Sequence, residues 1–212
     1  MEQIAHIETH LSGKFGVPRQ SGAVSPLTGR IVFEPAYRNP DALRGLETFS
    51  HIWLIWQFSA AVRPGEKPPV TVRPPRLGGN TRMGVFATRS PFRPNHLGLT
   101  AVKIEQLSLE GPDGPTITVS GVDLMDGTPI FDIKPYLPYA DSIPEATGGY
   151  TDTLPDLRLT VHFPEELLKT FPEDCREELL GILQHDPRPQ YQKQPNRLYG
   201  LTYLGRNVKF CI

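Results

Sequence analysis

"LTAVKIEQLSLEGPDGPTITVSGVDL", residues 99–124, is the stretch that decides the fold of this chain. On both sides of the central "GPDGP", apolar and β-branched residues alternate with polar ones, which is the pattern of half-buried strands. Glycine takes positive φ easily and proline fixes φ near −65°, so "GPDGP" is typical of a turn. The stretch therefore predicts a long antiparallel hairpin.

Short runs rich in β-branched or aromatic residues, each bounded by Gly or Pro, continue this pattern along the chain. The predicted strands cover residues 4–8, 30–34, 51–59, 69–73, 83–89 and 130–134. Strands at this spacing, with no helices between them, predict an antiparallel barrel or sandwich. Residues 39–50 add one short helix, capped by Asn39 or Asp41.

The pattern changes after about residue 145. Residues 164–185 predict a helical stretch interrupted at Pro172, and two short strands follow it. We therefore expect a mainly β fold, with an antiparallel β-barrel domain over residues 1–145 and a small C-terminal α+β domain over residues 146–212. The sequence has no GxGxxG motif opening a helix after a strand and no P-loop, so neither motif points to a Rossmann domain.

The composition is ordinary for a soluble globular protein, with 38% hydrophobic and 21% charged residues in 212. No run approaches the roughly 18 apolar residues that a membrane span needs, and no signal peptide is recognisable. Cys175 and Cys211 show neither pairing logic nor metal-ligand spacing. We expect a cytoplasmic protein with no membrane partner and no metal.

Charge is distributed unevenly along the chain. Residues 63–93 carry seven bases and one acid, residues 187–212 carry five bases and no acid, and residues 105–186 carry seventeen acids and four bases. Such segregation indicates a polyanion-binding surface on an acidic body. The alternative is that distant segments intermix in space and the asymmetry disappears.

"ATRSPFRPNHLGLT", residues 87–100, predicts a stiff polar loop that leads into a strand. Pro91 and Pro94 forbid a helix, because each lacks an N–H and biases its predecessor to extended geometry. A stiff loop loses little conformational entropy when it binds a ligand. The arginines and the asparagine of this loop are therefore candidate binding residues.

"DLMDGTPIFDIKPYLPYAD", residues 123–141, is the second dense motif. Its "DGTP" is a turn signal, and the alternation in "IFDIK" places Phe131 and Ile133 on one strand face and Asp132 and Lys134 on the other. The alternative is purely structural: two tight turns at the end of a barrel, with Asp132 and Lys134 as a surface pair.

Six motifs in order resemble the TrmO (TsaA-like) family, from about residue 4 to 191. They are "FGVPRQSG", "LRGLETFSHIWLIWQF", "TVRPPRLGGN", "MGVFATRSPFRPNHLGLT", "DLMDGTPIFDIKPYLPYAD" and the C-terminal "DPRPQY". The resemblance implies a homodimeric S-adenosylmethionine-dependent tRNA methyltransferase with a β-barrel catalytic domain. Its implied substrate is the exocyclic N6 of threonylcarbamoyladenosine (t6A37), beside the anticodon of threonine tRNA.

The resemblance also implies which residues bind the methyl donor. They are Pro18, Arg19, Gln20, Ser59, Ala60, Arg89, Leu99, Asp126, Gly127, Thr128 and Pro129. Arginine and aspartate suit the amino-acid end of the donor, which carries a carboxylate and an ammonium group.

The chemistry of the acceptor adds further candidates. A ureido N–H is a poor nucleophile until its proton leaves, so a carboxylate or tyrosinate is needed as the base. Asp126, Asp132 and Tyr136 are the candidates, and the sequence does not rank them. The remaining basic and polar residues are expected to bind substrate: Arg93, Asn95 and Lys134 at the modified base, and Arg73, Arg76, Arg82 and the basic tail at the phosphates.

Two other functions stay open at this point. A non-catalytic nucleic-acid-binding barrel would use the same basic loops and exposed aromatics but would not bind S-adenosylmethionine. A metal-dependent hydrolase could use Asp123, Asp126 and Asp132, although their spacing matches no calcium loop. Chelator-sensitive activity would favour the hydrolase.

Overall fold

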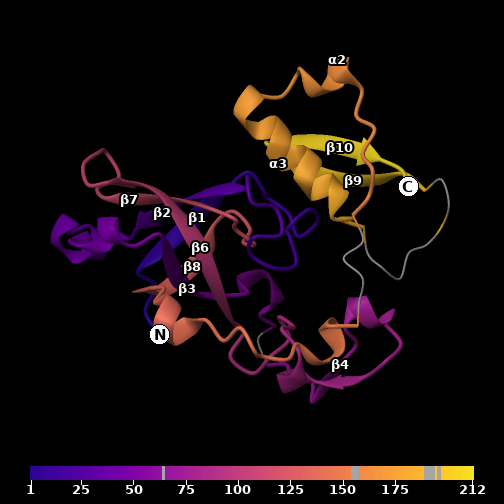
Figure 1. Cartoon of the computed structure of the whole chain (residues 1–212), viewed down its shortest axis with the longest axis horizontal. Coiled ribbons are helices and arrows are strands. Elements are labelled where there is room, and N and C mark those ends of the chain that lie inside the picture. Colours follow the sequence, from indigo (N-terminus) through magenta and orange to yellow (C-terminus); the bar gives the residue numbers. More distant parts are fainter. Residues whose placement is uncertain (64, 154–157, 189–193, 195–196) are drawn as a thin grey trace.

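The computed structural model describes residues 1–63, 65–153, 158–188, 194 and 197–212. Six strands form a closed antiparallel barrel in the order β1-β2-β7-β6-β3-β8 (Figure 1). Their bounds are β1 Ala5–Thr9, β2 Thr28–Phe33, β3 His51–Gln57, β6 Leu97–Ser108, β7 Thr116–Ser120 and β8 Thr128–Pro135. The prediction of a mainly β chain with an antiparallel barrel is confirmed.

Strict alternation in β3 shows why these residues close a barrel. Ile52, Leu54 and Trp56 are buried, whereas the residues between them are only partly covered. Each such buried side chain contributes about 1.5–3 kcal/mol relative to an exposed one. The inward-facing side chains of all six strands fill the barrel with a common core.

The long hairpin predicted from residues 99–124 consists of β6 and β7. Leu107 pairs with Ile117 and Ser108 with Thr116, and the connecting turn contains Gly114 at φ 75°. Strand β7 ends at Ser120, four residues earlier than predicted. Residues 121–127 therefore form a loop at the end of the barrel.

Two predicted strands are much shorter in the structure: Pro69 and Pro74 lie close to either side of the first, and the second gives way to the 3-10 helix Val85–Ala87. β4 covers Thr71–Val72 and β5 covers Met83–Gly84, and together they form a separate two-stranded sheet. The single helix predicted at residues 39–50 is two 3-10 helices, and Asn39 caps the first by accepting from the Asp41 N–H. The short 3-10 helices of the described residues are η1 Pro35–Tyr37, η2 Pro40–Leu43, η3 Leu46–Thr48, η4 Ser59–Ala61, η5 Pro75–Leu77, η6 Val85–Ala87 and η7 Gly149–Thr151.

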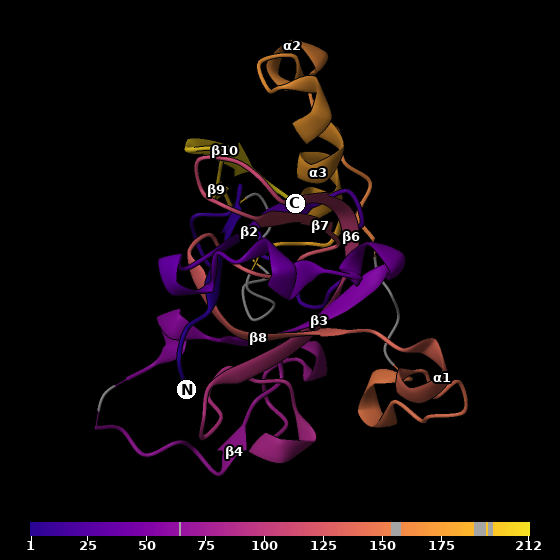
Figure 2. The same ribbon diagram turned by 90° about the vertical axis from the view of Figure 1, so that its left-hand side faces the viewer.

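The C-terminal lobe is small and α+β, as predicted. Helix α3 (Glu173–Gln184) lies against the hairpin of β9 (Tyr199–Tyr203) and β10 (Arg206–Phe210), and α2 (Glu165–Leu168) precedes it (Figures 1 and 2). Pro172 separates the two helices, and the short α1 (Pro138–Asp141) lies at the barrel. No helix in the described part of the chain is long and apolar enough to cross a membrane.

The lobe packs on one end of the barrel through a continuous core. Val24 and Leu27 from the barrel belong to the same buried cluster as Ile182 from α3. Gly181 lies so close to Val24 that an added Cβ would sit 2.8 Å from its Cγ1. A glycine at this point of α3 therefore lets the helix approach the barrel.

Candidate active site

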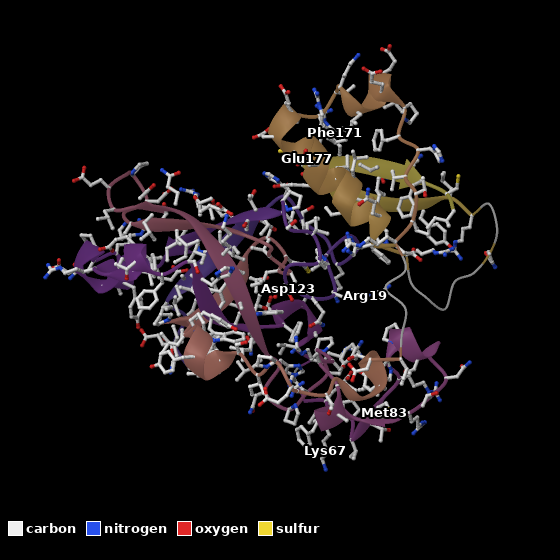
Figure 3. The ribbon with its side chains drawn as sticks, viewed as in Figure 1. Arg19, Lys67, Met83, Asp123, Phe171 and Glu177 are labelled. Atoms are coloured by element: carbon white, nitrogen blue, oxygen red, sulfur yellow. The ribbon has the colours of Figure 1, made fainter. Side chains whose placement is uncertain are left out.

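One end of the barrel gathers most of the residues that the sequence singled out. Every neighbouring pair in the barrel is antiparallel, so β1, β3 and β7 end where β2, β6 and β8 begin. The loops that meet at this end are residues 10–27, 58–60, 88–96 and 121–127. Figure 3 shows Asp123 and Arg19 on the side of the barrel that faces the C-terminal lobe.

The loop around residues 88–96 is held by its own hydrogen bonds. The Arg93 guanidinium donates to the Thr88 carbonyl at 3.0 Å, and the His96 ring lies 2.8 Å from the Pro91 carbonyl. The Phe58 N–H in turn donates to the His96 carbonyl at 2.8 Å, which ties the loop to the end of β3. The loop is built as a fixed support, as its prolines predict.

The segment around residue 20 lies directly against this loop and against the end of β7. The exposed Arg89 guanidinium donates to the Gln20 amide oxygen, and the Gly22 N–H donates to the Gly121 carbonyl at 2.9 Å. Two residues implied by the resemblance, Arg89 and Gln20, are thus brought together from positions 69 residues apart.

The turn at residues 126–129 is fixed to the end of β1. Asp126 Oδ1 accepts from the Thr9 N–H at 3.0 Å, and the Asp126 N–H donates to the Leu11 carbonyl at 2.9 Å. Gly127 has φ 72°, a conformation that favours glycine. Asp126 and Gly127 are exposed at the same barrel end as Arg89, whereas Thr128 is buried and its hydroxyl donates to the Met125 carbonyl.

A chain of hydrogen bonds leads from the barrel interior to Asp123. Trp56 Nε1 donates to Thr100 Oγ1 at 2.9 Å, and Thr100 Oγ1 donates to Asp123 Oδ1 at 2.9 Å. Burial raises the pKa of Asp123 to about 6, although the Thr100 hydrogen bond and the charge of Arg89 both lower it. An ionisable group with a pKa near neutrality at the mouth of a barrel is a functional-site candidate.

From the sequence, Asp123 is predicted only as a metal ligand of the alternative hydrolase, and Thr100 and Trp56 are not among the predicted site residues. A signal was present: Thr100 is a polar residue at an inward-facing position of a strand that is otherwise apolar inside. Buried polar side chains need partners, and Thr100 finds them in Trp56 and Asp123.

Asp132, Lys134 and Tyr136 lie elsewhere, on the outer face of the barrel. Asp132 is opposite Ile55, and Lys134 is opposite Trp53, both pointing to solvent as the alternation predicts. A register shift beside Ile55 leaves Phe131 out of the pairing with β3. Tyr136 packs against Trp53 with ring centroids 5.5 Å apart. The structure does not bring these three side chains into contact with Asp123 or Arg89.

The other donor residues that the resemblance implies differ in exposure. Pro18 is buried, whereas Arg19 is exposed and reaches the Asp186 carbonyl at 3.5 Å. Ser59 and Ala60 are exposed in η4, and the Ala60 carbonyl accepts from Lys14 Nζ at 3.0 Å. Leu99 is exposed on the outer face of β6, opposite Ile55, and Asn95 is exposed in its loop.

The two basic segments lie in different parts of the molecule. Arg73 and Arg82 are exposed on the excursion that carries β4 and β5, which Figure 3 locates through Lys67 and Met83. In the C-terminal lobe, Arg206 lies over the Phe171 ring at 5.2 Å and also donates to the Thr170 carbonyl. Lys193 and the last three residues of "DPRPQY" lie outside the described residues.

A second cluster of polar groups lies between the barrel and the lobe. The ligand atoms of His10, Cys175 and Glu178 are all within 4.8 Å of one another, a spacing that could hold a metal ion. Both oxygens of Glu178 are already used, because they accept from Thr28, His10 and Tyr203. The cluster is therefore best explained as a hydrogen-bonded joint. The three aspartates of the hydrolase hypothesis do not form such a group in the described residues.

Comparison with known proteins gives consistent matches. Residues 6–142 match the tRNA-methyltransferase O N-terminal domain, and residues 156–212 match the TrmO C-terminal domain. The chain is 43% identical over its whole length to the tRNA (adenine(37)-N6)-methyltransferase of Escherichia coli, covering 92% of that protein. It is 40% identical to a putative S-adenosylmethionine-dependent methyltransferase, RcsF, of Pseudomonas aeruginosa, with 97% of this chain and 89% of that protein aligned.

Solved structures agree with these matches. The crystal structure of TrmO from Pseudomonas aeruginosa superposes with a TM-score of 0.76 at 30% sequence identity, covering 99% of this chain and 90% of that one. A similarity of this extent includes both the barrel and the C-terminal lobe.

Proposed function

This chain belongs to the TrmO family, and from that premise we propose which adenosine it modifies. It is an S-adenosylmethionine-dependent tRNA (adenine37-N6)-methyltransferase. We propose that its acceptor is N6 of threonylcarbamoyladenosine in threonine tRNA. The observation that carries the assignment of the site is the meeting of Arg89, Gln20 and the 126–129 turn at one barrel end.

The residues at this end fit S-adenosylmethionine. Arg89 offers a guanidinium to the carboxylate of the donor, and Asp126 offers an exposed carboxylate to its ammonium group. The backbone of the 126–129 turn and of residues 18–20 lies beside these two charges. When bound, the donor supplies a methyl group on a positively charged sulfur. The protein must align this methyl group with N6, and alignment alone can lower a barrier by several kcal/mol.

Loss of either charge is expected to weaken donor binding. Arg89→Ala and Asp126→Ala should each raise the Kd for S-adenosylmethionine at least tenfold, which corresponds to ~1.4 kcal/mol. Isothermal titration calorimetry measures this directly. Arg44→Ala and Asp41→Ala are matched controls, because this exposed ion pair lies in the η2 region and should leave the Kd unchanged. Wild-type affinity in both site variants would remove Arg89 and Asp126 from the donor site.

The threonylcarbamoyl group is expected to be required before methyl transfer. Acylation makes the exocyclic N–H more acidic, and the added carboxylate gives Arg93 an anion to bind. Lys134, the other residue predicted for this role, points outward from the barrel and away from this site. Arg93 uses one of the five N–H donors of its guanidinium to bind the Thr88 carbonyl, so other donors remain for a substrate carboxylate. Methyl transfer to a tRNA transcribed in vitro should therefore be more than tenfold slower than to the same tRNA after threonylcarbamoylation. Equal rates would show that the enzyme reads plain adenine.

We further propose that exposed bases of the 63–93 segment contact the phosphates and that the enzyme is a homodimer. Arg73 and Arg82 support the first proposal, because they are exposed on the β4–β5 excursion. Exposed apolar side chains on and beside the barrel's outer face support the second, namely Leu99, Tyr139 and Ile143.

A further inference from the structure

The sequence predicts three carboxylate or phenol candidates for proton removal, and the structure places them in different surroundings. Asp132 and Tyr136 lie on the outer face of the barrel. Asp126 is exposed, and its Oδ1 accepts from the Thr9 N–H, which fits a turn-fixing role. Tyr136 is partly buried and packs against Trp53, but it lies away from the barrel end where Arg89 and Gln20 meet.

Asp123 combines a partly buried position with a place at that barrel end. Its side chain lies beside the predicted donor residues, because the Gly22 N–H binds the Gly121 carbonyl and so holds the segment after Gln20 against the loop that carries Asp123. The charge of Arg89 also acts on this carboxylate and lowers its pKa. Thr100 Oγ1 donates to Asp123 Oδ1 from inside the barrel, and Trp56 Nε1 in turn donates to Thr100 Oγ1. The carboxylate is thus oriented from the rigid core while it faces the loops of the site. A base held by supporting hydrogen bonds keeps its geometry during proton transfer.

We propose that Asp123 is the general base that removes the N6 proton of the target adenosine, an inference that rests on the proposed methyltransferase activity. In this step the N6–H bond breaks and its proton passes to the Asp123 carboxylate. The N6 electron pair forms the bond to the methyl carbon, and the carbon–sulfur pair stays on sulfur. Thr100 and Trp56 are positioning residues that act through Asp123.

The environment of Asp123 supports this role. Burial raises its pKa to about 6, so the group is ionised at neutral pH and still basic enough to accept a proton. The positive charge of Arg89 lowers the pKa of Asp123 and so opposes the effect of burial. The neutral Thr100 hydroxyl and Ser21 backbone also lower it.

The test compares variants in single-turnover methyl transfer to threonylcarbamoylated tRNA. Asp123→Asn should lower the rate at least 100-fold while the Kd for S-adenosylmethionine stays within threefold of wild type. Asp113→Asn is the matched control. Asp113 lies in the β6–β7 turn and pairs with Arg30 of β2, so this substitution should leave the rate unchanged. A rate within threefold of wild type for Asp123→Asn, or a 100-fold loss in Asp126→Asn alone, would overturn the proposal.

Thr100→Val provides a second test that keeps Asp123 in place. Loss of the Thr100 hydrogen bond should raise the pKa of Asp123, so the acid limb of the pH–rate profile should move to higher pH. Thr100→Ser should restore the limb. If Asp123→Asn does not fold, an unmoved limb in Thr100→Val overturns the proposal. Wild-type protein that fails to methylate tRNA would instead refute the proposed function.

A measurement without donor or tRNA gives an independent readout. The folded chain holds a proton on Asp123 up to about pH 6, whereas the unfolded chain releases it near the ordinary Asp value. This group should therefore make the free energy of unfolding fall as the pH rises from 4 to 6. The difference between wild type and Asp123→Asn isolates that fall, and identical pH dependence in both would contradict the placement of the base.

Discussion

Replacing Glu178 by alanine is expected to destabilise the protein by about 3–5 kcal/mol, because it leaves a buried set of donors without their acceptor. Glu178 is 2% exposed in α3. Its Oε1 accepts from the Thr28 N–H and hydroxyl at 3.0 and 2.7 Å, and its Oε2 lies 2.8 Å from the His10 ring and 2.6 Å from the Tyr203 hydroxyl. The joint between barrel and lobe depends on this one carboxylate.

Urea unfolding of the full chain measures this loss. Glu177→Ala is the matched control, because Glu177 is the neighbouring residue on α3 but is exposed (Figure 3). Such a surface substitution should change the free energy of unfolding by no more than about 0.5 kcal/mol. If both variants unfold at the same urea concentration, the Glu178 cluster does not hold the lobe to the barrel.

The joint also has a pH window that follows from its two titrating groups. The hydrogen bond to Glu178 raises the pKa of His10, although burial opposes this rise. The stabilisation of the fold by protonated His10 is therefore complete below the ordinary pKa of His and is lost as the pH rises through the raised value. Burial alone would raise the pKa of Glu178, but hydrogen bonds from His10, Tyr203 and Thr28 together lower it. Its contribution is therefore present above the ordinary pKa of Glu and is lost as the pH falls through the lowered value. The ion pair is strongest between roughly pH 4.5 and 6.5.

Gly98→Ala is expected to lower the free energy of unfolding by about 2–4 kcal/mol. It should also disturb the hydrogen bonds that lead from Trp56 to Asp123. An added Cβ would lie 2.2 Å from Cε2 and 2.4 Å from Cζ2 of Trp56. The indole is held by its bond to Thr100 and by Phe58, whose ring centroid is 4.3 Å away. It must move to admit the methyl group, and its hydrogen bond to Thr100 would then be lost.

Gly84→Ala is the control for this substitution. Gly84 has φ −56°, and an added Cβ there meets nothing within 4 Å. Thermal unfolding should show a lower Tm for Gly98→Ala only, and the intrinsic Trp fluorescence should change with it. Wild-type unfolding of Gly98→Ala would mean that Trp56 has room to move, and the chain from Trp56 to Asp123 would not be rigid.

The sequence by itself determined the local elements of this protein. Alternation in "HIWLIWQ" and in the 99–124 hairpin gave strands with one buried face, because side chains of a strand point to opposite sides in turn. Pro172 set the break between the two C-terminal helices, and the motif resemblance pointed to the family. These features depend on neighbouring residues, so the order of the chain is enough to predict them.

Only the tertiary structure decided which of these residues meet. The closure order of the barrel places the end of β7 beside the start of β6, so Asp123 meets Thr100, and β3 supplies Trp56 to the same chain. His10 and Glu178 meet across 168 positions. Alternation predicts that Asp132 points away from the core. Only the closure of the barrel decides that this outer face lies away from Arg89 and Asp123. Contacts between strand ends and between lobes are set by the packing of the whole core, and no local pattern in the sequence encodes them.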